Sequence, residues 1–166
     1  GLGTAQLGQI YGITKRKKIY SIKESKKIID LIKNNLKKID LIDTAELYGD
    51  SEKLIGKLDT KLLKIVTKIN ISPNKKNLRN QIIEKFNNSL KKLNKKSIYG
   101  LLIHNPLILK KKNFQNEIFD TLIELKEKKF VKHLGLSIYN PQELEYHLNQ
   151  FNYDIIQSPF NLLDQR

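Results

Sequence analysis

Four polar residues of this chain, Asp43, Tyr48, Lys68 and His104, carry side chains that together could transfer a proton. A tyrosine hydroxyl has an ordinary pKa of about 10, so it is a reluctant acid or base at neutral pH. A lysine ammonium close by favours the phenolate and lowers that pKa, while a carboxylate keeps the lysine charged and oriented. Tyr48, Lys68 and Asp43 would supply these three groups.

Such a trio could protonate a carbonyl oxygen as a hydride reaches the carbonyl carbon. A neutral imidazole at His104 could donate a hydrogen bond to the same oxygen and fix its position. Each residue also has a plainer explanation. Asp43 and Lys68 could form a structural ion pair, Tyr48 could be a turn aromatic, and His104 could be a hydrogen-bonded loop residue. The joint occurrence of the four residues favours a catalytic role over these structural explanations.

The positions of these residues relative to apolar runs point to a common edge of a sheet. Six short apolar runs punctuate the chain, and most end at one polar residue, namely Asp43, Lys68, His104, Ser137 and Gln157. In a barrel of parallel strands the active site is built at the carboxyl ends of the strands. We therefore expect these side chains to gather at one end of such a barrel.

The elements that would position them alternate between strand and helix. Ser21 predicts a helix N-cap, with Glu24 completing a capping box, and Asn140 predicts a second N-cap followed by Pro141 and Glu143. A loop is expected through Gly12 and the basic residues 15–18. The expected strands are 2–7, 39–42, 65–69, 101–103, 134–138 and 155–156, and the expected helices follow Ser21, begin at Asp50 or Ser51, span 78–93 and 116–129, and follow Asn140.

Alternating strands and helices imply βαβ units and a parallel sheet. An open doubly wound sheet usually carries a glycine-rich phosphate loop after its first strand, but the segment from Gly1 to Gln6 lacks the third glycine of that fingerprint. A (β/α)8 barrel needs eight strands and about 250 residues. We therefore predict an α/β fold that is an incomplete TIM barrel, with about six of the eight strand-helix units present.

Composition narrows the class of protein. The chain has 166 residues, a net charge of +14, and no cysteine, methionine or tryptophan, which excludes a disulfide framework and a cysteine-based metal site. The positive charge suggests nucleic-acid binding, yet only three of the 31 basic residues are arginine and the lysines occur in short dispersed runs. We expect no nucleic-acid partner, no membrane span and a cytoplasmic location.

The ends of the chain indicate a piece of a barrel. Gly1 lies inside an expected strand, and Arg166 follows no turn or cap. We expect residues 1–166 to form a single domain that corresponds to the N-terminal three-quarters of a barrel, with strands seven and eight lying beyond Arg166. Such a piece would lack most of the segments that bind a cofactor's pyrophosphate and adenosine phosphate.

The chain resembles the aldo-keto reductases, specifically bacterial members with a short N-terminus, over essentially all of its length. The segment Asp43-Thr44-Ala45 followed by Tyr48-Gly49 is fairly specific for that family, and the ordered set of matching segments is stronger still. These segments are 1–8, 11–12, 42–52, 66–68, 101–106, 134–137 and 156–159.

The resemblance implies an oxidoreductase that reduces an aldehyde or ketone to an alcohol with NADPH, with NADH as the alternative cofactor. It implies that Tyr48 is the general acid, that Lys68 lowers the pKa of Tyr48, and that Asp43 holds Lys68. It also implies that His104 orients the carbonyl group of a small substrate.

Cofactor contacts are implied as well. Ser137 and Gln157 would hydrogen-bond the nicotinamide carboxamide, while Thr4, Ala5 and Asp43 would line the ribose and nicotinamide.

One position departs from the pattern, because many members have asparagine where this chain has Ile138. Substrate contacts near Gln6, Tyr11 and Asn105 are weaker expectations.

Alternatives to the enzyme are a non-catalytic barrel that binds nicotinamide nucleotide, as a sensor or regulatory subunit, and an inactive truncated remnant. His133 and His147 are expected to be surface or packing residues, and the oligomeric state is left open.

Overall fold

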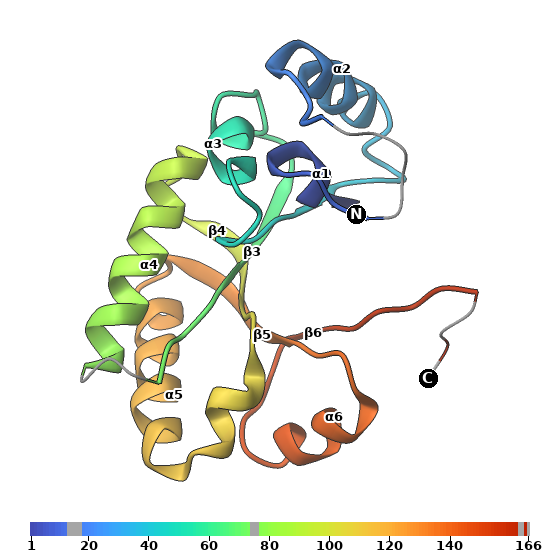
Figure 1. The fold of residues 1–166 in the computed structure, drawn as a ribbon. Helices are drawn as coiled ribbons and strands as arrows, with labels where there is room; N and C mark the ends of the chain where they lie inside the picture. Colours follow the sequence, from blue (N-terminus) through green and yellow to red (C-terminus); the bar gives the residue numbers. More distant parts are fainter. Residues whose placement is uncertain (13–17, 74–76, 163–164, 166) are drawn as a thin grey trace.

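The structure is a computed structural model that describes residues 1–12, 18–73, 77–162 and 165. Its strands form one parallel sheet in which each strand pairs with its neighbours along the chain, in the order β1-β2-β3-β4-β5-β6. The sheet curls into a partial barrel (Figure 1). The strands are β1 (Leu2–Gly3), β2 (Leu41–Asp43), β3 (Lys64–Ile69), β4 (Ile98–Ile103), β5 (Val131–Ser137) and β6 (Ile155–Gln157).

Helical segments alternate with these strands and lie on the outside of the curl. Helices α4 and α5 run side by side along its outer face (Figure 1). The predicted partial (β/α)8 barrel is therefore confirmed. The helical elements are α1 (Ala5–Gly8), α2 (Ile22–Lys33), α3 (Ser51–Gly56), α4 (Leu78–Leu93), the 3₁₀ helix η1 (Pro106–Lys110), α5 (Lys112–Glu127) and α6 (Pro141–Leu148).

Polar side chains at the helix starts explain where several helices begin. The hydroxyl of Ser21 accepts from the backbone N–H of Glu24, whose carboxylate in turn accepts from the backbone N–H of Ser21, which is the predicted capping box. Asn77 caps α4 and Asn140 caps α6 through side-chain oxygens. These local bonds satisfy backbone donors that would otherwise lack partners.

Alternation along β3 separates the packed core from the inside of the curl. Ile65 and Ile69 belong to the hydrophobic core beneath the helices, whereas Val66 lines a cavity inside the curl. Lys68 lies two residues after Val66 and so on the same face of the strand, and its side chain is buried. Because successive side chains of a strand point to opposite faces, this strand supplies both layers.

Some boundaries differ from those expected. Residues 5–7 form a helical turn instead of extending β1, because Leu7 N–H donates to the Thr4 carbonyl. β4 and α5 begin earlier than expected, and the 3₁₀ helix η1 was not expected. The basic loop expected at residues 15–18 lies mostly outside the described residues.

Among the described residues, no helix combines the length and apolar character that crossing a bilayer requires.

Gly8 lies where two backbone segments approach closely. A Cβ at this position would lie 1.9 Å from the carbonyl oxygen of Tyr48 and 2.2 Å from the nitrogen of Ser51. Both atoms are backbone atoms, so neither can move aside as a side chain could. Glycine is therefore required for α1 to pack against the turn that carries Tyr48.

We expect the substitution Gly8→Ala to lower the free energy of unfolding by about 3 kcal/mol, because the added methyl group forces two backbone segments apart. Urea denaturation would measure this loss. Gly3→Ala is the matched control, since a Cβ at Gly3 would meet no atom within 4 Å, and it should change stability by less than about 0.5 kcal/mol. Equal stabilities for the two variants would contradict the argument.

Candidate active site

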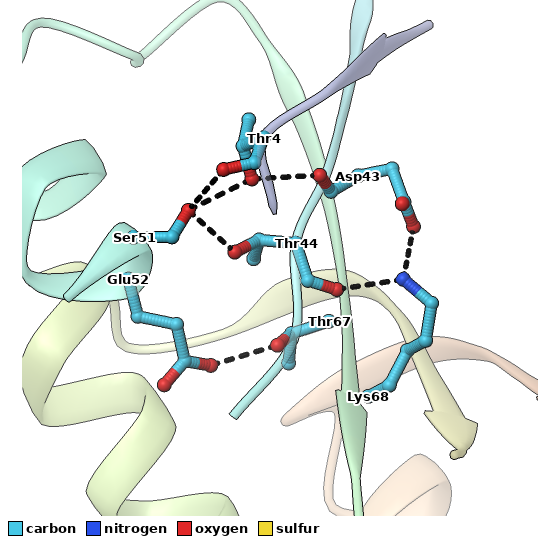
Figure 2. Close-up of polar contacts among 7 residues, drawn as sticks. All are labelled: Thr4, Asp43, Thr44, Ser51, Glu52, Thr67 and Lys68. Carbon is cyan, nitrogen blue, oxygen red and sulfur yellow. Dashed lines mark hydrogen bonds and ion pairs between the residues drawn. The ribbon is translucent and has the colours of Figure 1, made fainter. Parts of the chain in front are cut away.

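Lys68 lies at the centre of the site. It occupies the carboxyl end of β3, and its side chain is 1% exposed. Its ammonium donates to Asp43 Oδ1 at 2.6 Å and to the Thr44 carbonyl oxygen at 2.8 Å (Figure 2). Burial lowers the pKa of Lys68, while the charge of Asp43 and its hydrogen bond act in the opposite direction. The carboxylate and carbonyl thus offset the cost of burying an ammonium.

Tyr48 and His104 complete the group of four residues expected from the sequence. Lys68 Nζ lies 5.0 Å from the centroid of the Tyr48 ring, and the Tyr48 and His104 rings meet edge to face at 5.8 Å. Tyr48 sits on a turn in which its N–H donates to the Ala45 carbonyl, and His104 follows β4 directly. The parallel strands therefore bring the four residues together at one end of the barrel.

The pKa of Tyr48 is raised to about 12, chiefly by burial and next by the negative charge of Asp43. This direction is opposite to the one expected from the neighbouring lysine alone. Burial and the negative charge of Asp43 both disfavour the phenolate. Tyr48 is therefore protonated at neutral pH and has a proton to donate.

The imidazole of His104 is held in its neutral form. Burial lowers the pKa of His104 below its ordinary value of 6.5, and the positive charge of Lys68 acts in the same direction. Nδ1 of this ring is buried and has no hydrogen-bond partner among the described residues. A neutral imidazole carries one N–H donor, as a group that orients an oxygen requires.

Ser137 and Gln157 lie opposite one another on β5 and β6, both at the end of the barrel that holds Lys68. Ser137 is buried and Gln157 is half-buried. A cavity of about 480 Å³ inside the curl is lined by Asp43 and Gln157 together with apolar side chains such as Val66.

The remaining residue pair expected at the cofactor, Thr4 and Ala5, lies beside Asp43. Thr4 is fully buried, and its hydroxyl donates to the Asp43 carbonyl at 2.8 Å. Ala5 begins α1 and is half-buried. In this structure the side chain of Thr4 supports Asp43, and a contact of Thr4 or Ala5 with cofactor stays a prediction.

Residues expected near a substrate, and the departure at Ile138, have clear local roles. Gln6 Nε2 donates to the carbonyl of Tyr11, whose ring is exposed. Asn105 caps η1 by accepting from the N–H of Leu107. Ile138 is buried in the core, so it offers no side-chain amide.

The sequence analysis assigned no role in the site to several buried or half-buried polar residues around it. Ser51 Oγ lies within hydrogen-bond distance of Thr4 and Thr44, and Glu52 accepts from the Thr67 hydroxyl at 2.7 Å (Figure 2). Glu46 pairs with Lys85 and accepts from the N–H of Asn70. Their partners come from other strands and helices, so spacing along the chain carries no signal of them.

The two other histidines lie away from the four-residue group. His147 is fully buried, with its ring edge to face against Tyr146, and it is therefore a packing residue. His133 is half-buried and its ring contacts Tyr99. Both outcomes agree with the expectation of surface or packing roles.

Comparison with known proteins identifies the family. The model of the aldo/keto reductase family matches residues 1–166, which is the whole chain. The chain belongs to the aldo/keto reductase family. A search of curated protein sequences found no match.

Solved structures of aldo-keto reductases resemble this family member in fold. A Pseudomonas aeruginosa protein described as an aldo-keto reductase is 26% identical with a TM-score of 0.78, and the match covers 98% of this chain and 63% of that one. The holo form of a Bacillus halodurans aldo-keto reductase is 21% identical with a TM-score of 0.74, covering 96% and 52%. A Bombyx mori aldo-keto reductase in complex with NADP is 22% identical with a TM-score of 0.70, covering 96% and 53%. The chain thus spans less than two thirds of these structures.

We expect Asp43→Asn to destabilise this aldo/keto reductase by about 3 kcal/mol, because it removes the charge that compensates the buried ammonium of Lys68. Urea denaturation at pH 7 would measure the change. Asp40→Asn is the matched control, since Asp40 pairs with Lys64 at 2.6 Å but both side chains are about half exposed, and the loss of this solvent-screened pair should change stability far less. The expectation fails if the two variants lose equal stability.

Stability should also fall as the pH decreases from 7 through 6.5, because the pKa of His104 is lowered on folding. The unfolded chain binds a proton at this imidazole near pH 6.5, whereas the folded protein does so only at lower pH, so protonation favours unfolding in that window. Urea denaturation at pH 7.5, 6.5 and 5.5 (conditions spanning the ordinary imidazole pKa of about 6.5) would show the slope. His104→Gln should reduce that slope, and an unchanged slope would refute the assignment.

Proposed function

We propose that the protein reduces an aldehyde or ketone to an alcohol by hydride transfer from NADPH, with Tyr48 as the proton donor. The observation that carries this proposal is the buried ammonium of Lys68, which contacts the Asp43 carboxylate and lies against the Tyr48 ring. A structural ion pair needs no tyrosine and no neutral histidine beside it. The presence of both favours proton transfer over a purely structural role.

Each residue has a distinct part in the proposed step. Bound NADPH supplies the hydride. Tyr48 gives the proton of its hydroxyl to the carbonyl oxygen of the substrate, and the positive charge of Lys68 stabilises the phenolate that remains. Asp43 keeps Lys68 charged and fixed in place. His104 donates a hydrogen bond to the same oxygen and holds it near Tyr48.

The nicotinamide would be held by Ser137 and Gln157 through its carboxamide, with Thr4, Ala5 and Asp43 lining the ring and ribose. Two of these residues, Asp43 and Gln157, line the same cavity, which supports their part of this assignment. We favour NADPH over NADH, and the Bombyx mori relative was solved with NADP. The substrate is proposed to be a small carbonyl compound, and the protein is proposed to act in the cytoplasm without a nucleic-acid or membrane partner.

A second candidate function is a non-catalytic barrel that binds nicotinamide nucleotide. The observation that favours it is the pKa of Tyr48, which is raised to about 12 and makes this hydroxyl a weak acid. Such a protein would bind NADPH but would not oxidise it with any carbonyl compound. A truncated remnant would neither bind nor oxidise NADPH.

The test is NADPH oxidation, followed by the absorbance of the reduced nicotinamide, with a panel of aldehydes and ketones. The protein is expressed from its complete reading frame. We expect turnover with at least one of these substrates, and we expect Tyr48→Phe to lower kcat by about 10²- to 10⁴-fold, because it removes the acid. NADPH fluorescence should show that the variant still binds cofactor.

Full activity of Tyr48→Phe would show that another group donates the proton. Binding of NADPH without turnover on the whole panel would favour the non-catalytic barrel. Absence of both binding and turnover would favour the remnant.

A further inference from the structure

Three buried hydroxyl groups form a chain of hydrogen bonds behind the Lys68 site. Thr44 Oγ1 lies 3.1 Å from Ser51 Oγ, Ser51 Oγ donates to Thr4 Oγ1 at 2.9 Å, and Thr4 Oγ1 donates to the Asp43 carbonyl at 2.8 Å (Figure 2). All three hydroxyl-bearing residues are fully buried. Each hydroxyl can donate only one hydrogen bond. The Thr4 hydroxyl donates to the Asp43 carbonyl and the Ser51 hydroxyl donates to Thr4, so the Thr44 hydroxyl is the donor to Ser51.

The two ends of this chain hold neighbouring peptide groups. At one end the Asp43 carbonyl accepts from both the hydroxyl and the N–H of Thr4. At the other end lies Thr44, whose carbonyl oxygen accepts from the ammonium of Lys68. The Asp43 carboxylate and the Thr44 carbonyl are the two acceptors of that ammonium. The hydroxyl chain therefore fixes the backbone from which both acceptors project.

Ser51 is the central link, and it also connects to Tyr48. Its N–H donates to the Tyr48 carbonyl at 3.1 Å, and it begins α3 three residues after Tyr48. Its hydroxyl additionally lies 3.1 Å from the Thr4 carbonyl oxygen. Ser51 thus contacts the turn that carries Tyr48 through its backbone N–H, and the residues beside the acceptors of Lys68 through its hydroxyl.

We propose that Ser51 is a positioning residue, which acts through Thr4 and Thr44 to hold the acceptors of the Lys68 ammonium in place beside Tyr48. The proposal rests on the proposed function, because its consequence for turnover assumes that Tyr48 is the acid. Its consequence for Lys68 itself does not, since the contacts of the ammonium exist whether or not the protein turns over.

Loss of the Ser51 hydroxyl should loosen the acceptors and so make the charged form of Lys68 less favourable. The titratable groups around Lys68 are Asp43 from β2, Tyr48 from the following turn and His104 after β4, and only Asp43 raises its pKa. A weaker contact with Asp43 lets the effect of burial dominate. The ammonium would then lose its proton at a lower pH.

The experiment compares Ser51→Ala with the parent protein by two readouts. The first is the titration of Lys68 followed by NMR of its ¹³Cε resonance, assigned with Lys68→Arg. We expect its midpoint to fall by about one pH unit in Ser51→Ala. The second is the pH dependence of kcat for NADPH oxidation, where we expect kcat to fall about 3- to 10-fold and the alkaline limb to move to lower pH.

Ser25→Ala is the matched control for a structural effect. Ser25 is also fully buried, but its hydroxyl donates to the carbonyl of Ser21, the N-cap of α2, and not to a residue around Lys68. This variant loses a comparable hydrogen bond, so its thermal midpoint should drop, whereas the Lys68 titration and the alkaline limb should stay in place.

A second pair of variants covers the case in which Ser51→Ala does not fold. Thr44→Val keeps the shape of the side chain but removes the hydroxyl that donates to Ser51, and Thr44→Ser restores a hydroxyl. We expect Thr44→Val to shift the Lys68 titration in the same direction as Ser51→Ala, and Thr44→Ser to return it toward the parent value.

The proposal is overturned if the folded variants at positions 51 and 44 behave as Ser25→Ala does, with lower stability and an unmoved Lys68 titration. A shifted titration in a protein that oxidises no NADPH would support the positioning role while refuting the proposed function. The two failures are therefore distinguishable.

Discussion

The burial of one ammonium group sets the requirements that the surrounding structure has to meet. Lys68 points into the interior from the end of β3, and water does not solvate its charge. An uncompensated charge there would cost several kcal/mol. The compensation comes from Asp43, the last residue of the neighbouring strand β2, and from Thr44 directly after it. The contact between Asp43 and Lys68 thus depends on the register of β2 against β3, because a shift by one residue would turn Asp43 to the opposite face.

The same desolvated site sets the electrostatic conditions of the two rings beside the ammonium. Tyr48 stays protonated because burial and the negative charge of Asp43 raise its pKa, and His104 stays neutral because burial and the positive charge of Lys68 lower its pKa. Tyr48 keeps a proton that it can donate, and His104 keeps one N–H donor while its ring stays uncharged. A single desolvated site therefore holds two titratable groups in the states that hydrogen-bond donation requires.

The sequence allowed the prediction of features that depend on local order. The bounds of α4 follow from a helical stripe of apolar residues, and the capping box at Ser21 follows from two residues three apart. The convergence of Asp43, Lys68 and His104 follows from their places at strand ends in a parallel barrel. The helical turn at residues 5–7 and the roles of Ser51 and Glu52 depend on partners distant in sequence. The raised pKa of Tyr48 depends on burial, which the spacing of residues does not report.

The strand order of the sheet has a consequence for how the protein is assembled. Each hydrogen-bonded pair joins two strands that are consecutive along the chain, from β1 with β2 to β5 with β6. Within the described sheet each strand pairs with the strand that precedes it along the chain, so the entropy lost in closing each of these loops stays small. During synthesis at the ribosome, each new strand-helix unit can dock on the unit made just before it. The half of the site formed by Asp43 and Lys68 can therefore take shape while the segments that hold Ser137 and Gln157 are still being translated.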